Sequence, residues 1–397
     1  MSRKACVILF LLTLIACART PAQASETIVF SSHALQQAST RLAEGDPALM
    51  PAYRKLLREA EELLDVPAPT VTDKASTLPG IDPHDYVSLS PYWWPNPSTP
   101  DGLPFVRRDG QTNPQADSDR FDAQRMQQMA FMAETLALAY HFSGDERFAA
   151  KGAEVLRTWF LAPGTAMNPN FDHAQLRPGH ERQPSGIIVG NVLPRVVDAS
   201  LLLEESQHWS GTDAQNLRGW FARLLQWMLD STDGHEEAAR PNNRGSWYAA
   251  QAAVYARFTG NERALSSMAR KGRELVASQS TRDGSQPLEL KRTRPLKYSF
   301  FNLKALYTLA AAVQETDLSL WHYRTDDGKS LKIITGRIAP CLAAPDAVPA
   351  SLRKNSTLGR TQLLRRASIV YTGAGYDTAL DRLPHEREAR DRSNLAY

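Results

Sequence analysis

The stretch SWYAAQAAVYARFTGNERALSSMARKGRELVA, residues 246–277, decides the fold class. An Ala-rich apolar run fills its first half, and a second helix-like pattern fills residues 261–277. Between them lies Thr259-Gly260-Asn261, a short break made of residue types that favour turns. Two helices joined by so short a connection lie antiparallel. The stretch therefore predicts a helical hairpin.

The same alternation of helix and short break covers most of the chain. Breaks such as Ser210-Gly211-Thr212 separate neighbouring segments, and strand-like alternation is scarce, with Leu331–Ile338 as one candidate. The sequence has no clean period, which disfavours a short-repeat solenoid. We predict an all-α fold, a toroid or barrel of antiparallel helical hairpins whose long loops form a cleft. The other predicted helical segments are residues 32–64, 119–142, 146–160, 185–206, 212–230 and 299–315.

The first 24 residues, MSRKACVILFLLTLIACARTPAQA, have the features of a secretory signal peptide. Arg3 and Lys4 precede an apolar run, and Ala22-Gln23-Ala24 supplies a small-residue cleavage site. An alternative is lipid attachment at Cys17, which follows Leu14-Ile15-Ala16. We therefore expect a periplasmic or secreted protein, with a lipid-anchored outer-membrane lipoprotein as the alternative.

The composition after the leader excludes several classes of protein. The formal net charge of +3 equals that of the three basic leader residues, so the mature chain is neutral and any basic site is local. We expect no nucleic-acid partner, because the predicted export argues against one. Only Cys341 remains, which excludes an intrachain disulfide. No later run is expected to be long and apolar enough to cross a bilayer. We predict one domain over residues 25–380 and a charged, frayed tail over 381–397.

A long Pro-rich segment, residues 65–118, is predicted to be an ordered loop packed on the body. It contains YVSLSPYWWPNP, residues 86–97, in which Trp93 and Trp94 are adjacent. Loops of this length inside a compact protein are usually functional or disordered. Two interpretations of the indole rings stay open: they bind sugar faces, or they anchor the loop.

A second polar segment, MNPNFDHAQLRPGHERQPSG at residues 167–186, precedes an apolar run. It carries His173, Gln175 and His180, and it forms either the edge of a cleft or an ordinary solvated loop. No set of residues with metal-ligand spacing accompanies the two histidines, so we predict no metal site. The chain also lacks a phosphate-cradling Gly loop, a GxSxG elbow, an HExxH motif and a CxxC motif, and we predict no cofactor.

The segment PNNRGSWYAAQ, residues 241–251, places polar side chains at the start of a predicted helix. One asparagine is explained as an N-cap, which stabilises a helix by about 1 kcal/mol. The other asparagine of the pair Asn242-Asn243 and Arg244 are then left over. Because amide and guanidinium groups donate hydrogen bonds that a carboxylate accepts, these two residues are candidates for neutralising an acidic ligand.

The segment ELKRTRPLKYSFFNL, residues 289–303, sets four basic residues before Tyr298. Nearby positive charge favours the phenolate, so we expect the pKa of Tyr298 to be lowered. A tyrosine with a lowered pKa is suited to take a proton. The alternative is a charged helix entrance on which Tyr298 only packs.

Together these segments resemble the alginate-lyase-like superfamily of exported polysaccharide lyases. The resemblance runs from about Asp82 to Leu342, and it is carried by YVSLSPYWWPNPSTPDGLPFVRRDG, TWFLAPGTAMNPN, NNRGSWYAAQ and RTRPLKYSFFNL in that order. It implies an incomplete helical toroid that cleaves alginate or glucuronan by β-elimination, with no organic cofactor. An anionic polysaccharide is then the expected partner.

The resemblance also implies roles for individual residues. Asn243 would neutralise the uronate carboxylate, Tyr298 would act as acid and base, and Arg292 would be its electrostatic partner. The expected substrate-binding residues are Trp93, Trp94 and Gln175, to which we add five candidates from the same segments: His173, His180, Asn242, Trp247 and Arg294.

One position departs from the family pattern. Relatives commonly have His after the Asn pair, whereas this chain has Arg244, and an Arg cannot be a general base. Three outcomes follow: Tyr298 acts as both base and acid, Arg244 strengthens carboxylate neutralisation, or the protein only binds its glycan. Where relatives have an acidic residue after the Trp-Tyr pair, this chain has Ala249.

Two other functions stay open. A non-catalytic glycan-binding protein on the same fold is favoured by Arg244. A glycoside hydrolase needs two carboxyl groups about 5–9.5 Å apart across the scissile bond. The candidate acids for that role are Asp117, Asp119, Asp122, Asp172 and Glu289.

Overall fold

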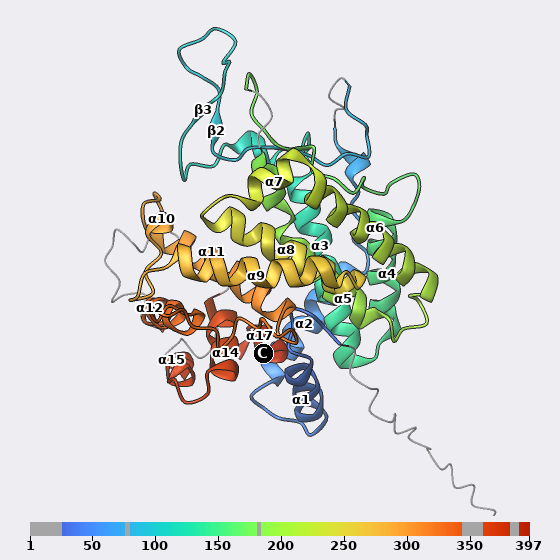
Figure 1. Ribbon diagram of the computed structural model, residues 1–397. Helices are drawn as coiled ribbons and strands as arrows, with labels where there is room; N and C mark the ends of the chain where they lie inside the picture. Colours follow the sequence, from blue (N-terminus) through green and yellow to red (C-terminus); the bar gives the residue numbers. More distant parts are fainter. Residues whose placement is uncertain (1–25, 76–79, 181–183, 344–359, 382–388) are drawn as a thin grey trace, which may run out of the picture.

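The computed structural model describes residues 26–75, 80–180, 184–343, 360–381 and 389–397 (Figure 1). The predicted leader, residues 1–24, and the alternative lipid site at Cys17 lie outside the described residues. The described chain is mostly helical. Its longer helices are α1 (Ser32–Ala43), α2 (Met50–Leu63), α3 (Ala123–Ser143), α4 (Glu146–Phe160), α5 (Leu193–Leu203), α6 (Gly211–Asp230), α8 (Asn243–Thr259), α9 (Glu262–Gln279), α11 (Pro295–Ala312), α12 (Leu331–Ala343) and α14 (Arg360–Val370).

Short helical elements complete the set. They are the 3-10 helices η1 (Val71–Asp73), η2 (Pro114–Asp117) and η3 (Pro184–Val192) and the α-helices α7 (Thr232–Ala238), α10 (Pro287–Leu290), α15 (Tyr376–Asp381) and α17 (Ser393–Ala396). The sequence pattern did not predict α7, α10 or the C-terminal helices. Each of α7, α10, α15 and α17 spans two turns or less, too short for an apolar period to show.

Helices α8 and α9 form the predicted hairpin, and residues at the turn between them end one helix and cap the next. Gly260 ends α8 with a positive φ of 71°, a conformation that costs glycine little. The side chain of Asn261 then accepts a hydrogen bond from the Ala264 amide and caps α9. Gly144 and Asp145 turn the chain from α3 to α4 in the same way, with φ 69° at the glycine and a side-chain cap at the aspartate. The hairpin prediction is confirmed.

Helix α8 lies at the centre of the core and packs against α11, α9, α6 and α5. It is buried on all sides, and its alanines let neighbouring helices approach closely. Large side chains fill the spaces around it, among them the fully buried indoles of Trp159, Trp220 and Trp247. Truncating one such ring to Ala typically costs about 3–5 kcal/mol. This packed centre fixes the position of the residues at the start of α8.

Four short strands order the loops on one side of the helices. Strand β1 (Val87–Leu89) pairs in parallel with β4 (His173–Leu176), and β2 (Trp93–Trp94) pairs antiparallel with β3 (Val106–Arg107). In Figure 1 the loop that carries β2 and β3 extends at the top, while α1 and the C-terminal helices lie at the bottom. The described part of the Pro-rich segment, residues 65–75 and 80–118, thus packs as an ordered structure, and its strand β1 joins the second polar segment at β4.

Three expectations are corrected. Leu331–Ile338 is not a strand, since it forms most of α12, and a short apolar run does not distinguish the two. One later segment, Gly186–Leu203, is long and apolar enough to cross a membrane, but 72% of it is buried inside the fold, as in a core helix. Residues 389–397 are not a frayed tail, because Leu395 is buried and Arg392 pairs with Glu59 and Glu134.

Candidate functional site

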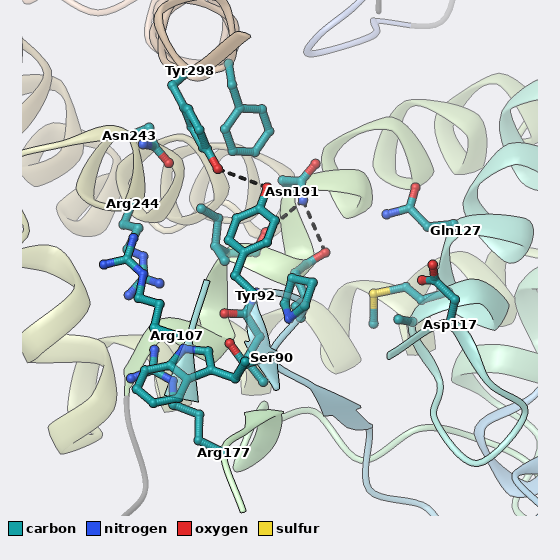
Figure 2. A pocket seen from close by; sticks show the side chains of 18 of the residues that line it. Ser90, Tyr92, Arg107, Asp117, Gln127, Arg177, Asn191, Asn243, Arg244 and Tyr298 are labelled. Atoms are coloured by element: carbon teal, nitrogen blue, oxygen red, sulfur yellow. Dashed lines mark hydrogen bonds between the residues drawn. The ribbon is translucent and has the colours of Figure 1, made fainter. Parts of the chain in front are cut away.

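A cavity of about 640 Å³ opens where the Pro-rich loop meets the starts of α8 and α11 (Figure 2). Most of the segments that the sequence singled out contribute to its walls. Tyr92 and Trp93 come from the loop, Gln175 comes from β4, and Tyr298 comes from α11. The beginning of α8 supplies Asn243 and Arg244, so residues distant in the sequence surround one space.

The hydroxyl of Tyr298 reaches into this cavity from the first turn of α11. It donates a hydrogen bond to the hydroxyl of Tyr92 across 2.9 Å. The guanidinium carbon of Arg292 lies 3.7 Å from the centre of the Tyr298 ring. Arg292 is itself held by Asp109, with a shortest contact of 2.7 Å. The predicted pairing of Tyr298 with Arg292 is therefore present, as a cation over an aromatic face.

The expected lowering of the Tyr298 pKa is wrong. Burial is the largest influence and raises the pKa above its usual value, and the neighbouring Tyr92 hydroxyl raises it further. Arg292 opposes this shift without overcoming it. The basic residues near Tyr298 in the sequence could not give the direction of its pKa shift, because desolvation of the hydroxyl depends on the fold. Tyr298 is consequently a neutral phenol at neutral pH.

The two asparagines before Arg244 have different roles. Asn242 is the N-cap of α8, and its side chain accepts a hydrogen bond from the Arg244 amide at 3.1 Å. Asn243 is buried, and both its backbone amide and its side-chain amide donate 2.7 Å hydrogen bonds to the carboxylate of Glu289. Glu289 thus fixes the orientation of Asn243. The side-chain nitrogen of Asn243 faces this carboxylate, so its side-chain oxygen is assigned to the side away from Glu289.

Arg244 follows in the first turn of α8 and is half-buried at the cavity wall. Burial lowers its pKa, while Glu237 opposes that shift. The chain makes a close turn here, because a Cβ at Gly245 would stand 2.1 Å from the carbonyl oxygen of Arg240. Only glycine allows that approach. Among the described residues that line the cavity, none is a histidine.

Three more arginines line the same side of the cavity. Arg107 comes from β3, Arg177 follows β4, and Arg240 follows α7. We call Arg107, Arg177, Arg240 and Arg244 the arginine wall. Burial lowers the pKa of Arg177 to about 10, and the other three arginines lower it too. The wall therefore gathers mutually repelling cations, an arrangement that suits an anionic ligand.

Trp93 and Gln175 line the cavity as predicted. Trp93 is flanked by Arg177, whose guanidinium carbon lies 4.6 Å from the ring centre, and by the ring of His180 at 4.7 Å. Gln175 has a positive φ of 55°, and its backbone amide donates to Ser88 Oγ at 2.9 Å. A non-glycine residue in this conformation is strained, and such strain is concentrated at functional sites.

Five predicted binding residues do not line the cavity: Trp94, His173, His180, Trp247 and Arg294. Trp247 is 1% exposed and packs on Phe301 in the core. His173 lies 3.4 Å from Asp85, and His180 contacts the Phe105 carbonyl at 2.6 Å. Trp94 donates to the Gln111 carbonyl, so it anchors the loop. Arg294 is the residue before α11.

The structure brings to the site several residues that the sequence motifs did not single out. They are Tyr92, Arg107, Asp109, Asn191, Glu237 and Arg240. Tyr92 stands directly before the Trp pair in the quoted motif, so its position was the signal that could have identified it. No group of three metal-binding side chains occurs in the part of the chain that the structure describes.

The fold and the site define a helical toroid with a cation-lined cavity. The sequence matches the alginate lyase family over residues 70–348. A crystal structure of an alginate lyase from Bacteroides ovatus is 32% identical and superposes with a TM-score of 0.85, covering 94% of this chain and 99% of that chain. The chain therefore belongs to the alginate lyase family, and these similarities support the class of polysaccharide lyase.

More distant structures share the fold. A variant of alginate lyase A1-III complexed with a tetrasaccharide is 13% identical, with a TM-score of 0.60 over 94% of this chain and 98% of that chain. Alginate lyase A1-III from Sphingomonas species A1 is also 13% identical, with a TM-score of 0.59 over 93% and 97% of the two chains. These structures have the predicted incomplete α/α toroid. Comparison with curated proteins gave no significant match.

Proposed function

We propose that this protein cleaves a uronic-acid-containing polysaccharide, of alginate or glucuronan type, by β-elimination. The observation that carries the proposal is the meeting of Tyr298, Asn243 and Arg244 in one cavity. This combination offers a proton-transfer group beside donors for a carboxylate. The family membership supports the same class of reaction.

The elimination begins at C5 of a uronate, next to its carboxylate. Guanidinium donors from Arg244, and the hydrogen of the Asn243 side-chain amide that Glu289 does not accept, reduce the charge on that carboxylate, which makes the C5 proton easier to remove. A base takes the proton, and the electron pair of the C5–H bond forms the C4=C5 double bond. The C4–O4 bond breaks at the same time or next, and O4 accepts a proton to leave as a hydroxyl.

Tyr298 is assigned both proton transfers. Its phenolate, a small fraction at neutral pH that its raised pKa makes a strong base, takes the C5 proton, and the phenol so formed gives that proton to O4. Arg292 over the ring stabilises the phenolate when it forms, whereas the Tyr92 hydroxyl accepts from Tyr298 across 2.9 Å and favours the neutral phenol. One residue can serve both steps when the proton and O4 lie on the same face of the sugar. Arg244 cannot accept a proton, so it cannot replace the second base of the family pattern. This scheme does not need that base, because Tyr298 serves both steps.

Two rival functions, hydrolysis of a glycoside and binding without cleavage, are each addressed by one observation. Of the described residues that line the cavity, only Asp117 carries a carboxylate, and a glycoside hydrolase of the usual kind needs two. Elimination is therefore favoured over hydrolysis. Arg244 in the position of the family histidine favours the other rival, a protein that binds a uronan without cleaving it. An exported location, periplasmic or outer-membrane, agrees with an extracellular polymer as substrate.

The test is the far-ultraviolet absorbance of the purified protein with polymannuronate, polyguluronate, glucuronan and hyaluronan, and with a neutral glucan as control. A rise with one uronan indicates the unsaturated product. Tyr298→Phe should reduce that rate by about 10²–10⁴-fold, the usual contribution of a general acid or base. Tyr53→Phe, a change on α2 outside the cavity, is the matched control. Binding of a uronan with no absorbance rise would sink the catalytic proposal and leave the binding function.

A further inference from the structure

A second, smaller cavity lies among helices α5, α8, α11 and α14 and adjoins the cavity that holds Tyr298. Its volume is about 20 Å³, and Asn191 lines both cavities. We call it the inner chamber. Its lining includes Arg195 from α5, Lys304 from α11 and Arg366 from α14 (Figure 1). None of the described residues that line it is an aspartate or a glutamate. Three cations therefore surround this space without a carboxylate in the described part of its wall.

The buried carboxylates close to these cations are engaged by other donors. Glu134 accepts a hydrogen bond from Arg195 at 3.0 Å. Asp198 accepts the backbone amides of residues 28–30, the shortest at 2.6 Å. Arg366 donates to a backbone carbonyl of the same segment. Two of the three cations thus have protein partners, and one remains.

The remaining cation is Lys304. Its ammonium group makes no hydrogen bond or ion pair with any residue that the structure describes. Burial and the neighbouring Arg195 lower its pKa to about 8, against the attraction of Glu134. With that pKa most of the side chain is still protonated at neutral pH. Because charges removed from water are normally paired, Lys304 requires a counter-charge that the described residues do not provide.

A second unsatisfied donor lines the inner chamber. Trp247 of α8 is 1% exposed, and its buried indole nitrogen has no acceptor among the described residues. Buried polar atoms are nearly always hydrogen-bonded in a folded protein. An ammonium group and an indole N–H can only donate. A ligand that satisfies both Lys304 and Trp247 must therefore accept hydrogen bonds, and it must carry negative charge to balance the lysine.

We infer that the inner chamber binds a small monovalent anion of about the size of chloride. A volume of about 20 Å³ is little more than the roughly 10–15 Å³ that one water needs, so a sugar or a uronate does not fit. A water molecule would accept the hydrogen bonds but leave the cations uncompensated. The anion would lie against α8 and α11, the helices that carry Asn243 and Tyr298. This inference goes beyond the proposed function and does not depend on it.

The experiment measures the melting temperature of the purified protein while chloride replaces methanesulfonate, a larger anion, at constant sodium concentration and pH. We expect the melting temperature to rise by about 2 °C for each tenfold increase of chloride above its Kd, because a ligand of the folded state adds stability with the logarithm of its concentration. Bromide should act like chloride. Crystals grown in bromide should show an anomalous scattering peak within hydrogen-bond distance of Lys304 Nζ.

Lys304→Met removes the ammonium group and keeps an unbranched side chain. It should abolish the chloride dependence and, without chloride, melt no lower than the wild type, because an unpaired buried cation is removed. A lysine with a merely structural role would give the opposite result, a lower melting temperature with the chloride dependence unchanged. Lys332→Met, at an exposed residue of α12 outside the inner chamber, is the matched control and should respond to chloride like the wild type.

The inference is overturned if chloride does not raise the melting temperature of the wild type, or if it raises that of Lys304→Met equally. A bromide peak without a chloride-dependent melting temperature would be binding at crystal concentration only, and it would also overturn the inference. The absorbance assay for uronan cleavage is a separate measurement. A protein that cleaves no uronan can still bind the anion, and loss of the anion site leaves the proposed elimination untouched.

Discussion

Tyr298 and Tyr92, 206 residues apart in the sequence, share a 2.9 Å hydrogen bond between their hydroxyl groups at the edge of the cavity. Tyr298 belongs to a helix that packs on the central α8, whereas Tyr92 belongs to the Pro-rich loop. The bond therefore joins the rigid core to the loop that covers it. Any ligand that displaces Tyr92 also changes the environment of the proposed acid and base.

Tyr92→Phe tests this relationship. The change removes the acceptor that orients the Tyr298 hydroxyl, so kcat should fall by about tenfold, the scale of one hydrogen bond. The fall should be smaller than that of Tyr298→Phe, because the proton-transfer group itself remains. Absorbance assays of both single variants and of the double variant provide the check. A double variant that is no slower than Tyr298→Phe is expected; additive losses would show that Tyr92 acts independently.

Glu289→Gln tests how Asn243 is held. The Glu289 carboxylate accepts two 2.7 Å hydrogen bonds from Asn243, and a Gln side chain has only one acceptor oxygen to offer. One donor of Asn243 would then face an amide NH₂ group, with a cost of about 1–3 kcal/mol. We expect a lower melting temperature and about a tenfold loss of kcat/KM. Full turnover in this variant would show that Asn243 does not need its carboxylate partner.

Arg244→His restores the residue that family members commonly carry. If Tyr298 is the base in the wild type, its raised pKa makes kcat/KM increase with pH, approaching about tenfold per unit below that pKa. A histidine with an ordinary pKa of about 6.5 would add a base active at neutral pH and flatten the profile above pH 7. The measurement is kcat/KM from about pH 6 to about pH 9.5, a range that covers the titration of an ordinary histidine and extends about three pH units above it.

Arg244→Lys is the control for this profile, since it keeps a positive charge and adds no base in the tested range. Its kcat/KM should keep the pH dependence of the wild type while its KM rises, because the bidentate guanidinium contact is lost. A wild-type profile that is already flat would refute the assignment of Tyr298 as base.

Helices were predictable because their signals are local. The break at Gly260-Asn261 and the caps around it depend on residues within a few positions of one another, and the structure has them in place. The strand predicted over Leu331–Ile338 was wrong because its signal was not decisive at the local level. A short apolar run satisfies both a buried strand and a buried helix, and only its packing against α11, α14 and α15 decides.

The site was predictable as a set of segments and less so as a set of side chains. Trp247 follows Asn243 by four residues, yet α8 is buried on every side, so its place in the motif did not reveal that it faces the core. The pairing of Tyr298 with Tyr92 depends on tertiary structure alone. The sign of the Tyr298 pKa shift was missed because burial outweighs the charges that the sequence displays.

Glu237 connects the site to the stability of the protein. Burial raises its pKa to about 7 from the usual 4.5, and Arg244, Arg240 and Arg177 only partly oppose this shift. A carboxyl group with a raised pKa favours the folded state when it is protonated. Its contribution is therefore complete below pH 4.5 and is lost as the pH rises through about 7.

Glu237→Gln replaces the protonated carboxyl with a neutral group of similar shape, so it should not lose stability over this range. We expect the melting temperature of the wild type to fall between pH 5 and pH 8 relative to the variant. The free energy of unfolding should fall by up to about 3 kcal/mol, at about 1.4 kcal/mol per pKa unit. Glu236→Gln, at the exposed neighbouring residue, should follow the wild type. The opposite result, a variant less stable than the wild type at pH 8, would mean that the ionised carboxylate stabilises the arginine wall, because the attraction of three guanidinium groups would then exceed the cost of burying the charge.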